Sequence, residues 1–486
     1  MRKGASIVAY KNVREFMKVL EEKKLLQRIT VPVDRELEIA EIVDRISKKS
    51  GPALLFENVK DSPYPLLINT FGSYERMNLA LEVQTLDEIA QEIKDLLDMS
   101  HYISMIDKIK SAPKFAKLAT IFPRKIKNAP CQQIVEQPTL SEIPVMKCWP
   151  QDGGQFITLP LVFSKDPETG RQNVGMYRLQ VYDDKTTGMH WHLHKDGREI
   201  YEKYRKQGKR MPVSVAIGAD PATIYASTAP LPKEIDEMIF AGFLRKSPVE
   251  MVRCISNEIE VPAHAEFVLE GYVDVSELKE EGPFGDHTGY YSLKDRYPVF
   301  HVEKVTRKER PIYCATVVGK PPMEDCYLGK ATERIFLPLL QLQLPEIVDM
   351  NFPIEGVFHN CVIVSIKKRY PGHAKKVMHA LWGMGQMMYT KMIIVVDQEI
   401  SPQDISTVAW KVFNNIDAKR DIVIVEGPLD ALDHASDLPC YGHKMGIDAT
   451  KKIASEGHLR AWPDDVKMSK EIKELVTGRW KEYGLS

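Results

Sequence analysis

The pattern of hydrophobic and polar residues changes twice along this chain of 486 residues, which suggests three regions. Residues 1–128 combine helical spacing of apolar positions with short apolar runs, as in a small α/β domain. The elements expected there are helices at 12–29 and 38–48, strands at 53–56 and 66–69, and a helix opened by the capping-box residues Thr85 and Glu88. We interpret the basic, proline-interrupted segment 114–128 as a linker.

Between 129 and 318 the pattern becomes a series of short β-like runs, most of them separated by turn residues. This texture predicts a β-barrel or a β-sandwich, interrupted by one helix near 234–244. The expected strands lie at 158–163, 173–182, 189–193, 213–217, 267–273 and 299–305.

From 319 to 486 strand and helix patterns alternate, which predicts a parallel sheet with crossover helices. Ser401 is expected to cap one of these helices, with Pro402 at its first position. No glycine-rich phosphate motif opens any of them, so a dinucleotide-binding domain is not expected. The predicted strands are 361–366, 392–397 and 421–425, and the predicted helices are 373–387 and 402–415.

Composition narrows the class of protein. Its 66 basic and 67 acidic residues nearly cancel, so no nucleic acid or other polyanion is expected as a partner. We find no stretch resembling a signal peptide and no apolar run long enough to cross a membrane. The seven cysteines are scattered and form no C-x-x-C pair, which indicates reduced cysteines and a cytoplasmic location.

The segment Glu281–Tyr291 (EGPFGDHTGYY) brings two carboxylates and a histidine together with glycine, proline and aromatic residues in one loop. It follows a predicted strand at 266–275, which its glycines and proline are expected to end. Such a loop can hold the carboxylates of Glu281 and Asp286 at a fixed separation, which suits proton transfer. The alternative is a surface turn whose acids are solvated.

A second candidate is the strand run Asn173–Arg178 (NVGMYR). Arg178 in an otherwise apolar strand needs an anionic partner if it is buried; otherwise it lies at a strand edge and reaches solvent. Residues five apart face opposite ways on a regular strand. If Asn173 and Arg178 serve one site, a bulge is expected at Gly175.

Three histidines alternate in His190-Trp-His192-Leu-His194 and would share one face of a strand. Three histidines on one face point to a metal or anion site more than a single histidine does, although packed or surface histidines remain the more common explanation of such spacing alone. Glu237 lies on a predicted amphipathic helix, where a solvated position is the simple alternative. Lys444, between glycines, either pairs with a phosphate or is exposed.

Together these motifs closely resemble the UbiD-like decarboxylase family. The similarity covers essentially the whole chain, and Glu281–Tyr291 is its most specific part. Stretches such as Ala331–Pro338 (ATERIFLP) and Asp433–Ser436 (DHAS) look like the members assigned to menaquinone biosynthesis, and the ubiquinone-pathway members are also similar.

The resemblance implies an N-terminal α/β region at 1–128, a central split β-barrel like those of flavin reductases at 129–318, and a C-terminal α/β oligomerisation domain at 319–486. It also implies reversible, non-oxidative decarboxylation of an aromatic acid with prenylated FMN. A divalent metal, usually Mn²⁺, would bind the cofactor phosphate, with K⁺ nearby. A side chain cannot accept the electrons left when an aryl carbon loses carbon dioxide, so a cofactor must.

Residue by residue, the resemblance implies metal ligands at Asn173, His194 and Glu237. The catalytic set would be Arg178, Glu281 and Asp286, with Asp286 as the proton donor where some members have Glu. Further cofactor contacts would come from Met176, Tyr177, Arg178, His190, Trp191, His192, Lys195, Ala226, Ser227 and Lys444, the alanine and serine lying near the K⁺.

The implied substrate is a quinone precursor, and the implied partners are a flavin prenyltransferase that supplies the cofactor and further copies of the chain, as a dimer or hexamer. Peripheral membrane association is expected if the substrate is prenylated. Three alternatives stay open: a carboxylase of phenolic substrates, a non-catalytic flavin-binding subunit of a complex, and an ordinary flavin reductase.

Overall fold

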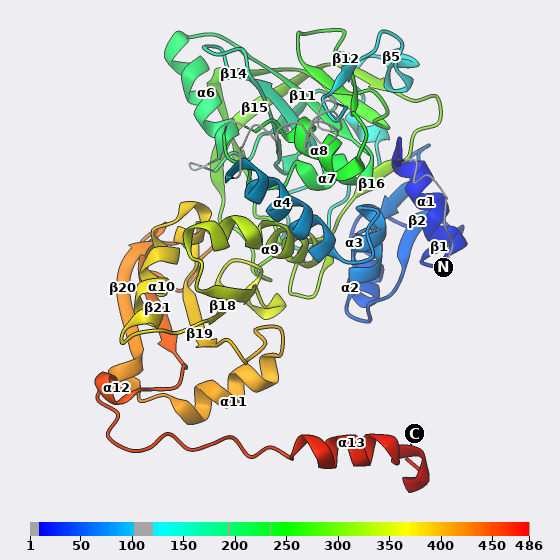
Figure 1. Cartoon of the computed structure of the whole chain (residues 1–486). Coiled ribbons are helices and arrows are strands. Elements are labelled where there is room, and N and C mark those ends of the chain that lie inside the picture. Colours follow the sequence, from blue (N-terminus) through cyan, green and yellow to red (C-terminus); the bar gives the residue numbers. More distant parts are fainter. Residues whose placement is uncertain (1–8, 102–119, 193–194, 234, 486) are drawn as a thin grey trace.

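The computed structural model describes residues 9–101, 120–192, 195–233 and 235–485. The fold is mixed α/β, with the N-terminal part, a large central sheet and a C-terminal sheet arranged around helix α9 (Glu324–Gln343) (Figure 1). Within the described residues, no helix combines the length and apolarity that a membrane crossing needs. Part of the predicted linker, 114–119, lies outside the described residues.

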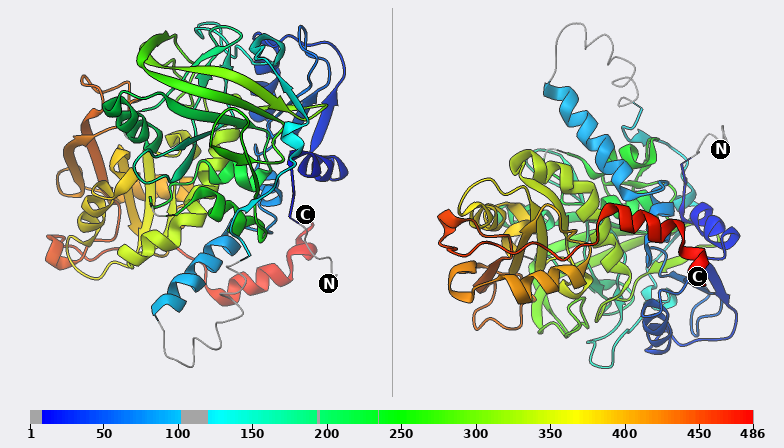
Figure 2. Two further views of the ribbon diagram at one scale, coloured as in Figure 1. Left: turned by 90° about the horizontal axis from the view of Figure 1, so that it is seen from above. Right: turned by 60° about the horizontal axis from the view of Figure 1, so that its bottom comes forward.

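The N-terminal part is a four-stranded sheet with helices around it. The predicted helix at 12–29 is wrong in its second half, because Lys24 adopts a positive φ of 60° that ends the helix and turns the chain into a strand. The capping box is confirmed in part, since Glu88 Oε1 accepts from the Thr85 amide at 3.3 Å. The sheet order is β1 (Leu26–Ile29), β2 (Ala53–Phe56), β3 (Leu66–Ile68) and β16 (Tyr313–Ala315), and the helices are α1 (Val13–Glu22), α2 (Glu38–Ser47), α3 (Tyr74–Ala80) and α4 (Leu86–His101), of which α4 projects from the body (Figure 2).

The central sheet is dominated by two long antiparallel strands, β14 (Phe267–Glu281) and β15 (Asp295–Arg307). The prediction that β14 ends near 275 is wrong: a register shift between Asp274 and Leu278 keeps it paired with β15 as far as Glu281. The path runs β10 (Thr186–Gly188), β15, β14, β11 (Met211–Ile217), β7 (Leu161–Lys165) and β8 (Gln172–Met176), with β5 (Ile134–Glu136) paired to β15.

Smaller elements surround this sheet. The predicted helix near 234–244 is confirmed as α8 (Glu237–Arg245), whereas α6 (Asp196–Gln207) and α7 (Pro221–Ala226) were not predicted. The remaining strands are β4 (Arg124–Lys125), β6 (Phe156–Ile157), β9 (Leu179–Gln180), β12 (Glu250–Arg253) and β13 (Glu260–Pro262).

The C-terminal sheet is parallel only at its centre, which corrects the prediction of a fully parallel sheet. β20 and β17 pair antiparallel at the two edges. The order is β17 (Ile347–Asn351), β18 (Cys361–Ile366), β19 (Met392–Asp397), β21 (Tyr441–Asp448) and β20 (Ile422–Pro428), with helices α10 (His373–Trp382), α11 (Ile405–Asn415) and α12 (Ala418–Asp421). Asp404 rather than Ser401 caps α11, because its carboxylate accepts from the Thr407 amide at 3.1 Å.

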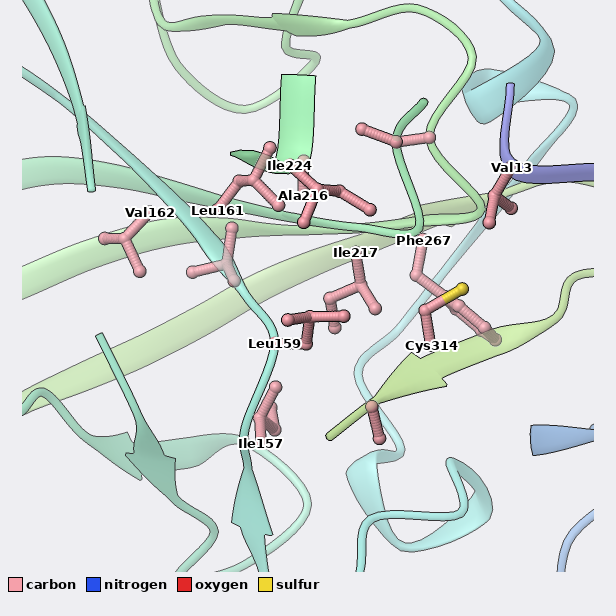
Figure 3. Packing of buried hydrophobic residues seen from close by; sticks show 14 of the residues in the cluster. Val13, Ile157, Leu159, Leu161, Val162, Ala216, Ile217, Ile224, Phe267 and Cys314 are labelled. Carbon is pink, nitrogen blue, oxygen red and sulfur yellow. The ribbon is translucent and has the colours of Figure 1, made fainter. Parts of the chain in front are cut away.

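One hydrophobic core joins the N-terminal helices to the central sheet. Figure 3 shows Val13 of α1, Ile217 of β11, Phe267 of β14 and Cys314 of β16 within the same cluster. This shared core fixes β14, and therefore Glu281 at its end, against most of the molecule. A separate core lies under the C-terminal sheet.

The last part of the chain leaves the C-terminal sheet and runs to helix α13 (Lys470–Gly478), which Figure 1 shows apart from the body. Apolar side chains along this segment remain exposed, among them Leu475 at 51% and Trp480 at 46%. The described part of the chain leaves this face uncovered.

Candidate active site

The loop after β14 is held in place by backbone contacts that only small residues permit. Asp152 accepts hydrogen bonds from the amides of Gly285 at 2.7 Å and Trp149 at 2.8 Å. A Cβ on Gly285 would lie 2.1 Å from Cδ1 of Trp149, and a Cβ on Gly282 would lie 2.5 Å from the Cα of Gly153. The glycines of the motif therefore let the loop pack directly against the chain at 149–153.

Arg178 bridges the two carboxylates of this loop. Its Nε and Nη2 donate to Glu281 Oε1 at 3.0 and 2.8 Å, and its Nη1 donates to Asp286 Oδ2 at 2.5 Å. Ser292 accepts a further bond from Nη2 at 3.2 Å. The three charged side chains are at most 9% exposed, so the alternatives of a strand-edge arginine and of solvated acids are wrong.

Two histidines extend the cluster from Glu281. Nδ1 of His190 lies 2.8 Å from Glu281 Oε1, and its Nε2 lies 2.8 Å from Nε2 of His192. The residues 189–192 are not a strand, contrary to the prediction, because β10 ends at Gly188. His190 and His192 nevertheless face each other, while Trp191 between them is buried.

Two further histidines extend the cluster from Asp286. Nδ1 of His287 lies 2.8 Å from Asp286 Oδ1, and its Nε2 lies 2.9 Å from Nε2 of His359. His359 precedes β18 in the C-terminal sheet, so the cluster draws on two parts of the chain that are far apart in sequence.

The charges of the cluster set its protonation. Burial raises the pKa of Asp286, but Arg178 and His287 outweigh it and hold this pKa well below its usual range. For Glu281 burial also raises the pKa, and Arg178 with His190 brings it below the ordinary value. Burial and the Arg178 charge lower the pKa of His190. Both carboxylates are therefore ionised at neutral pH.

A second group of candidate site residues lies around Asn173 and Glu237. Asn173 and Glu237 line one small cavity, together with Arg171 and Lys233. Nδ2 of Asn173 is buried and has no hydrogen-bond partner among the residues that the structure describes. Burial raises the pKa of Glu237 to about 7, and the nearby Asp236 and Asp196 carboxylates act in the same direction.

These features fit a bound cation. An amide and a carboxylate are ligands of a hard divalent ion, and the cavity is also lined by Asp166, Asp196 and Glu199, the last of which pairs with Lys233. The predicted third ligand, His194, lies outside the described residues. In the ranges that the structure describes, no three His, Cys, Asp or Glu side chains are grouped to enclose a metal.

The bulge at Gly175, expected if Asn173 and Arg178 served one site, does not occur. β8 pairs with β7 in continuous register from Gln172 to Met176. A Cβ on Gly175 would lie 2.4 Å from the Tyr177 ring, so the glycine instead lets that ring fold back over the strand. Arg178 lies beyond the end of β8 and contacts Glu281 and Asp286. Asn173 instead lines the cavity with Glu237.

The other residues predicted to contact the cofactor lie in different surroundings. Tyr177 packs its ring edge-on to Trp191, whose buried Nε1 has no partner, and Met176 ends β8. Lys195 is exposed at the start of α6. Ala226 and Ser227 are buried at the end of α7. Lys444 is buried in β21 and donates to the Met388 carbonyl, a contact within the C-terminal region, so the prediction that it is exposed is wrong.

The sequence analysis assigned no role to His287, His359 or Asp152. His287 had a visible signal, because it directly follows Asp286 in the loop motif. His359 had none, since its contact with His287 spans 72 positions and exists only through the packing of the C-terminal region.

Comparisons with known proteins identify the family of this chain. Family models of the 3-octaprenyl-4-hydroxybenzoate carboxy-lyase match residues 17–96 (N-terminal domain), 124–321 (Rift-related domain) and 326–449 (C-terminal domain). An uncharacterized protein of Archaeoglobus fulgidus is 51% identical over 98% of this chain and 99% of its own length. Another from Aquifex aeolicus is 46% identical over 98% and 99%.

Two solved structures share the whole fold. The vanillic acid decarboxylase of Sedimentibacter hydroxybenzoicus, in closed form, gives a TM-score of 0.84 at 28% identity over 97% of this chain and 99% of that one. The UbiD-class enzyme HmfF of Pelotomaculum thermopropionicum, in complex with FMN, gives 0.81 at 26% identity over 96% and 100%. This chain therefore belongs to the UbiD family and is a carboxy-lyase.

Proposed function

We propose that this protein decarboxylates an aromatic acid without oxidation, in a reversible reaction that uses prenylated FMN. The observation that carries the proposal is the bridge from Arg178 to the buried, ionised carboxylates of Glu281 and Asp286. Two structural relatives support the substrate class and the cofactor: one is a vanillic acid decarboxylase, and HmfF has been solved with FMN and, in an evolved dimeric form, with prenylated FMN.

When bound, prenylated FMN supplies the electron sink that no side chain offers. Asn173, Glu237 and His194 would hold a divalent ion, Mn²⁺ in our proposal, against the cofactor phosphate. Tyr177, Trp191 and the positive charges at the cavity would complete that pocket. We assign K⁺ to the region of Ala226 and Ser227. We also propose that Met176, Lys195 and Lys444 contact the cofactor.

The protein's own part in the reaction is to orient the substrate and to move a proton. Arg178 fixes the side chain of Glu281 and compensates the negative charge of the site. Asp286 passes a proton to the carbon that loses carbon dioxide. Because Asp286 is ionised at rest, it must receive that proton from a neighbour during each turnover.

We propose a quinone precursor as the substrate, on the strength of the motifs shared with the quinone-pathway members. The finer architecture that we propose is a split barrel at 129–318 between domains at 1–128 and 319–486. The exposed apolar face of the segment carrying α13 supports assembly with further copies of the chain, because such a face is costly to leave in water.

Co-expression with a flavin prenyltransferase tests the proposal. We expect mass spectrometry to find prenylated FMN on the purified chain, and a screen of aryl acids to detect carbon dioxide release. Glu281→Gln and Asp286→Asn, which preserve shape and remove charge, should bind cofactor but lose turnover. Near-normal activity in both variants would refute the assigned roles.

A further inference from the structure

The contact between His287 and His359 joins the catalytic loop to the C-terminal region. Nδ1 of His287 faces Asp286 Oδ1 at 2.8 Å, and its Nε2 faces Nε2 of His359 at 2.9 Å. The other ring nitrogen of His359, Nδ1, is buried without a partner. The proposed function uses Asp286 but gives these two histidines no task.

The geometry limits where the protons are. Two ring nitrogens 2.9 Å apart share one proton, so one donates and the other accepts. A carboxylate opposite Nδ1 requires a proton there as well. If His287 donates at both nitrogens it is an imidazolium, and His359 is its neutral acceptor.

The surrounding charges favour this arrangement. Asp286, Asp325 and Asp430 all act on His287, and although burial lowers the pKa of this histidine, Asp286 raises it above the ordinary value. Burial and the charge of His287 lower the pKa of His359 to about 4, and Lys195 acts in the same direction. The pKa of His287 is raised and that of His359 is lowered, so a proton taken up by the pair resides on His287 and His359 is its neutral acceptor.

The segment that presents His359 is built for this contact. Val357 and Phe358 adopt positive φ values of 45° and 52°, a conformation that costs free energy for residues other than glycine. In this shape the Phe358 ring stacks on the His287 ring with centroids 5.0 Å apart. A Cβ on Gly329 would lie 2.6 Å from Cβ of Phe358, so the glycine makes room for the segment.

We propose that His287 stores the proton consumed in the decarboxylation, and that His359 is a positioning residue that holds His287 in its doubly protonated form. This inference rests on the proposed function of the Arg178, Glu281 and Asp286 set. When the bond from the substrate carbon to the carboxylate breaks, carbon dioxide leaves and the electron pair forms a new C–H bond. Asp286 first takes a proton from Nδ1 of His287 and then passes it to this carbon, so Asp286 returns to its carboxylate form and His287 is left neutral. One proton per turnover then returns to His287 from solvent.

The proposal predicts a specific effect of His359→Leu in the full chain. Without its acceptor, the imidazolium of His287 is less stable, so His287 loses its proton at a pH about one unit lower. Because the active form is the protonated one, activity is lost as pH rises, and the basic limb of the kcat profile moves by the same amount. We expect kcat to fall about tenfold at pH 8 and to recover at pH 6.

A second readout does not depend on turnover. In the chain labelled with ¹⁵N-histidine, the ring signals of His287, assigned by their loss in His287→Gln, report its protonation directly. His359→Gln should restore the wild-type titration, because its side-chain oxygen can accept from Nε2. His264→Leu, which removes a histidine paired with Glu250 on β12, is the matched control and should leave both readouts unchanged.

Unchanged His287 signals and an unchanged pH profile in His359→Leu would overturn the inference. If that variant does not fold, His359→Lys replaces it, because a protonated lysine cannot accept a hydrogen bond. His359→Lys should then shift the His287 titration downward, and an unshifted titration would also overturn the inference. If no aryl acid is decarboxylated by the wild type, the proposed function fails. The ring signals then still decide whether His359 holds the proton on His287.

Discussion

Replacing Arg178 by methionine should destabilise the protein strongly, because it removes the guanidinium from two buried carboxylates and leaves Glu281 beside His190 and Asp286 beside His287. The Glu281 and Asp286 side chains are only 1% and 8% exposed. Removing one partner of such a buried pair costs about 3–5 kcal/mol. Arg253→Met is the matched control: its ion pair with Glu258 has side chains 66% and 76% exposed, and a surface pair contributes about 0–1 kcal/mol.

The effect should depend on pH in a defined direction. In the wild type both carboxyl pKa values lie below their usual range, so their contribution to stability is present above pH ~4 and is lost as pH falls through the folded values. Without Arg178 both carboxyl pKa values rise relative to the wild type, because burial raises them and the guanidinium no longer helps the neighbouring histidines to lower them. The penalty then grows as pH rises, and the variant approaches the wild type on acidification.

Urea unfolding followed by tryptophan fluorescence measures both effects. We expect the difference in free energy of unfolding between Arg178→Met and the wild type to be larger at pH 7.5 than at pH 5. The reasoning would be refuted if Arg178→Met lost no more stability than Arg253→Met at pH 7.5, or if its loss were the same at both pH values.

Three further changes test other parts of the site. Gly285→Ala should lower kcat at least about tenfold while circular dichroism stays native, because its Cβ would strike the Trp149 ring. Glu237→Gln should weaken binding of FMN with Mn²⁺ at least about tenfold by calorimetry, and unchanged binding would remove Glu237 from the ligand set. Leu475→Asp should shift the chain to a smaller assembly by light scattering, whereas an unchanged mass would exclude α13 from the interface.

Local elements of this structure could be predicted from the sequence, but most of the long-range strand pairing could not. Strand 53–56 and helix 38–48 were predicted almost to the residue, because period and caps are local properties. The extension of β14 to Glu281 could not be predicted, since pairing with β15 overrides the Gly/Pro signal that follows. The antiparallel pairing of β20 with β21 likewise depends on a strand that was not recognised.

The same holds for the candidate site: its motif residues were predicted, but its long-range contacts were not. The residues of Glu281–Tyr291 and Asn173–Arg178 were found because their unusual composition lies within short motifs. The sequence did not reveal whether Arg178 or burial decides the charge of Asp286, because that balance depends on distances. The contact with His359 was invisible for the same reason, as it depends on how the C-terminal region packs.

The backbone contact between Gly153 and Gly282 has a consequence for natural variation. A Cβ at either position would lie 2.5 Å from the Cα of the other, so the two sites constrain each other although they lie 129 positions apart. A side chain at one site cannot be compensated at the other, since glycine is already the smallest residue. Across relatives that keep this loop, both positions should therefore remain glycine, and a substitution at one should coincide with a change in the loop's length or path.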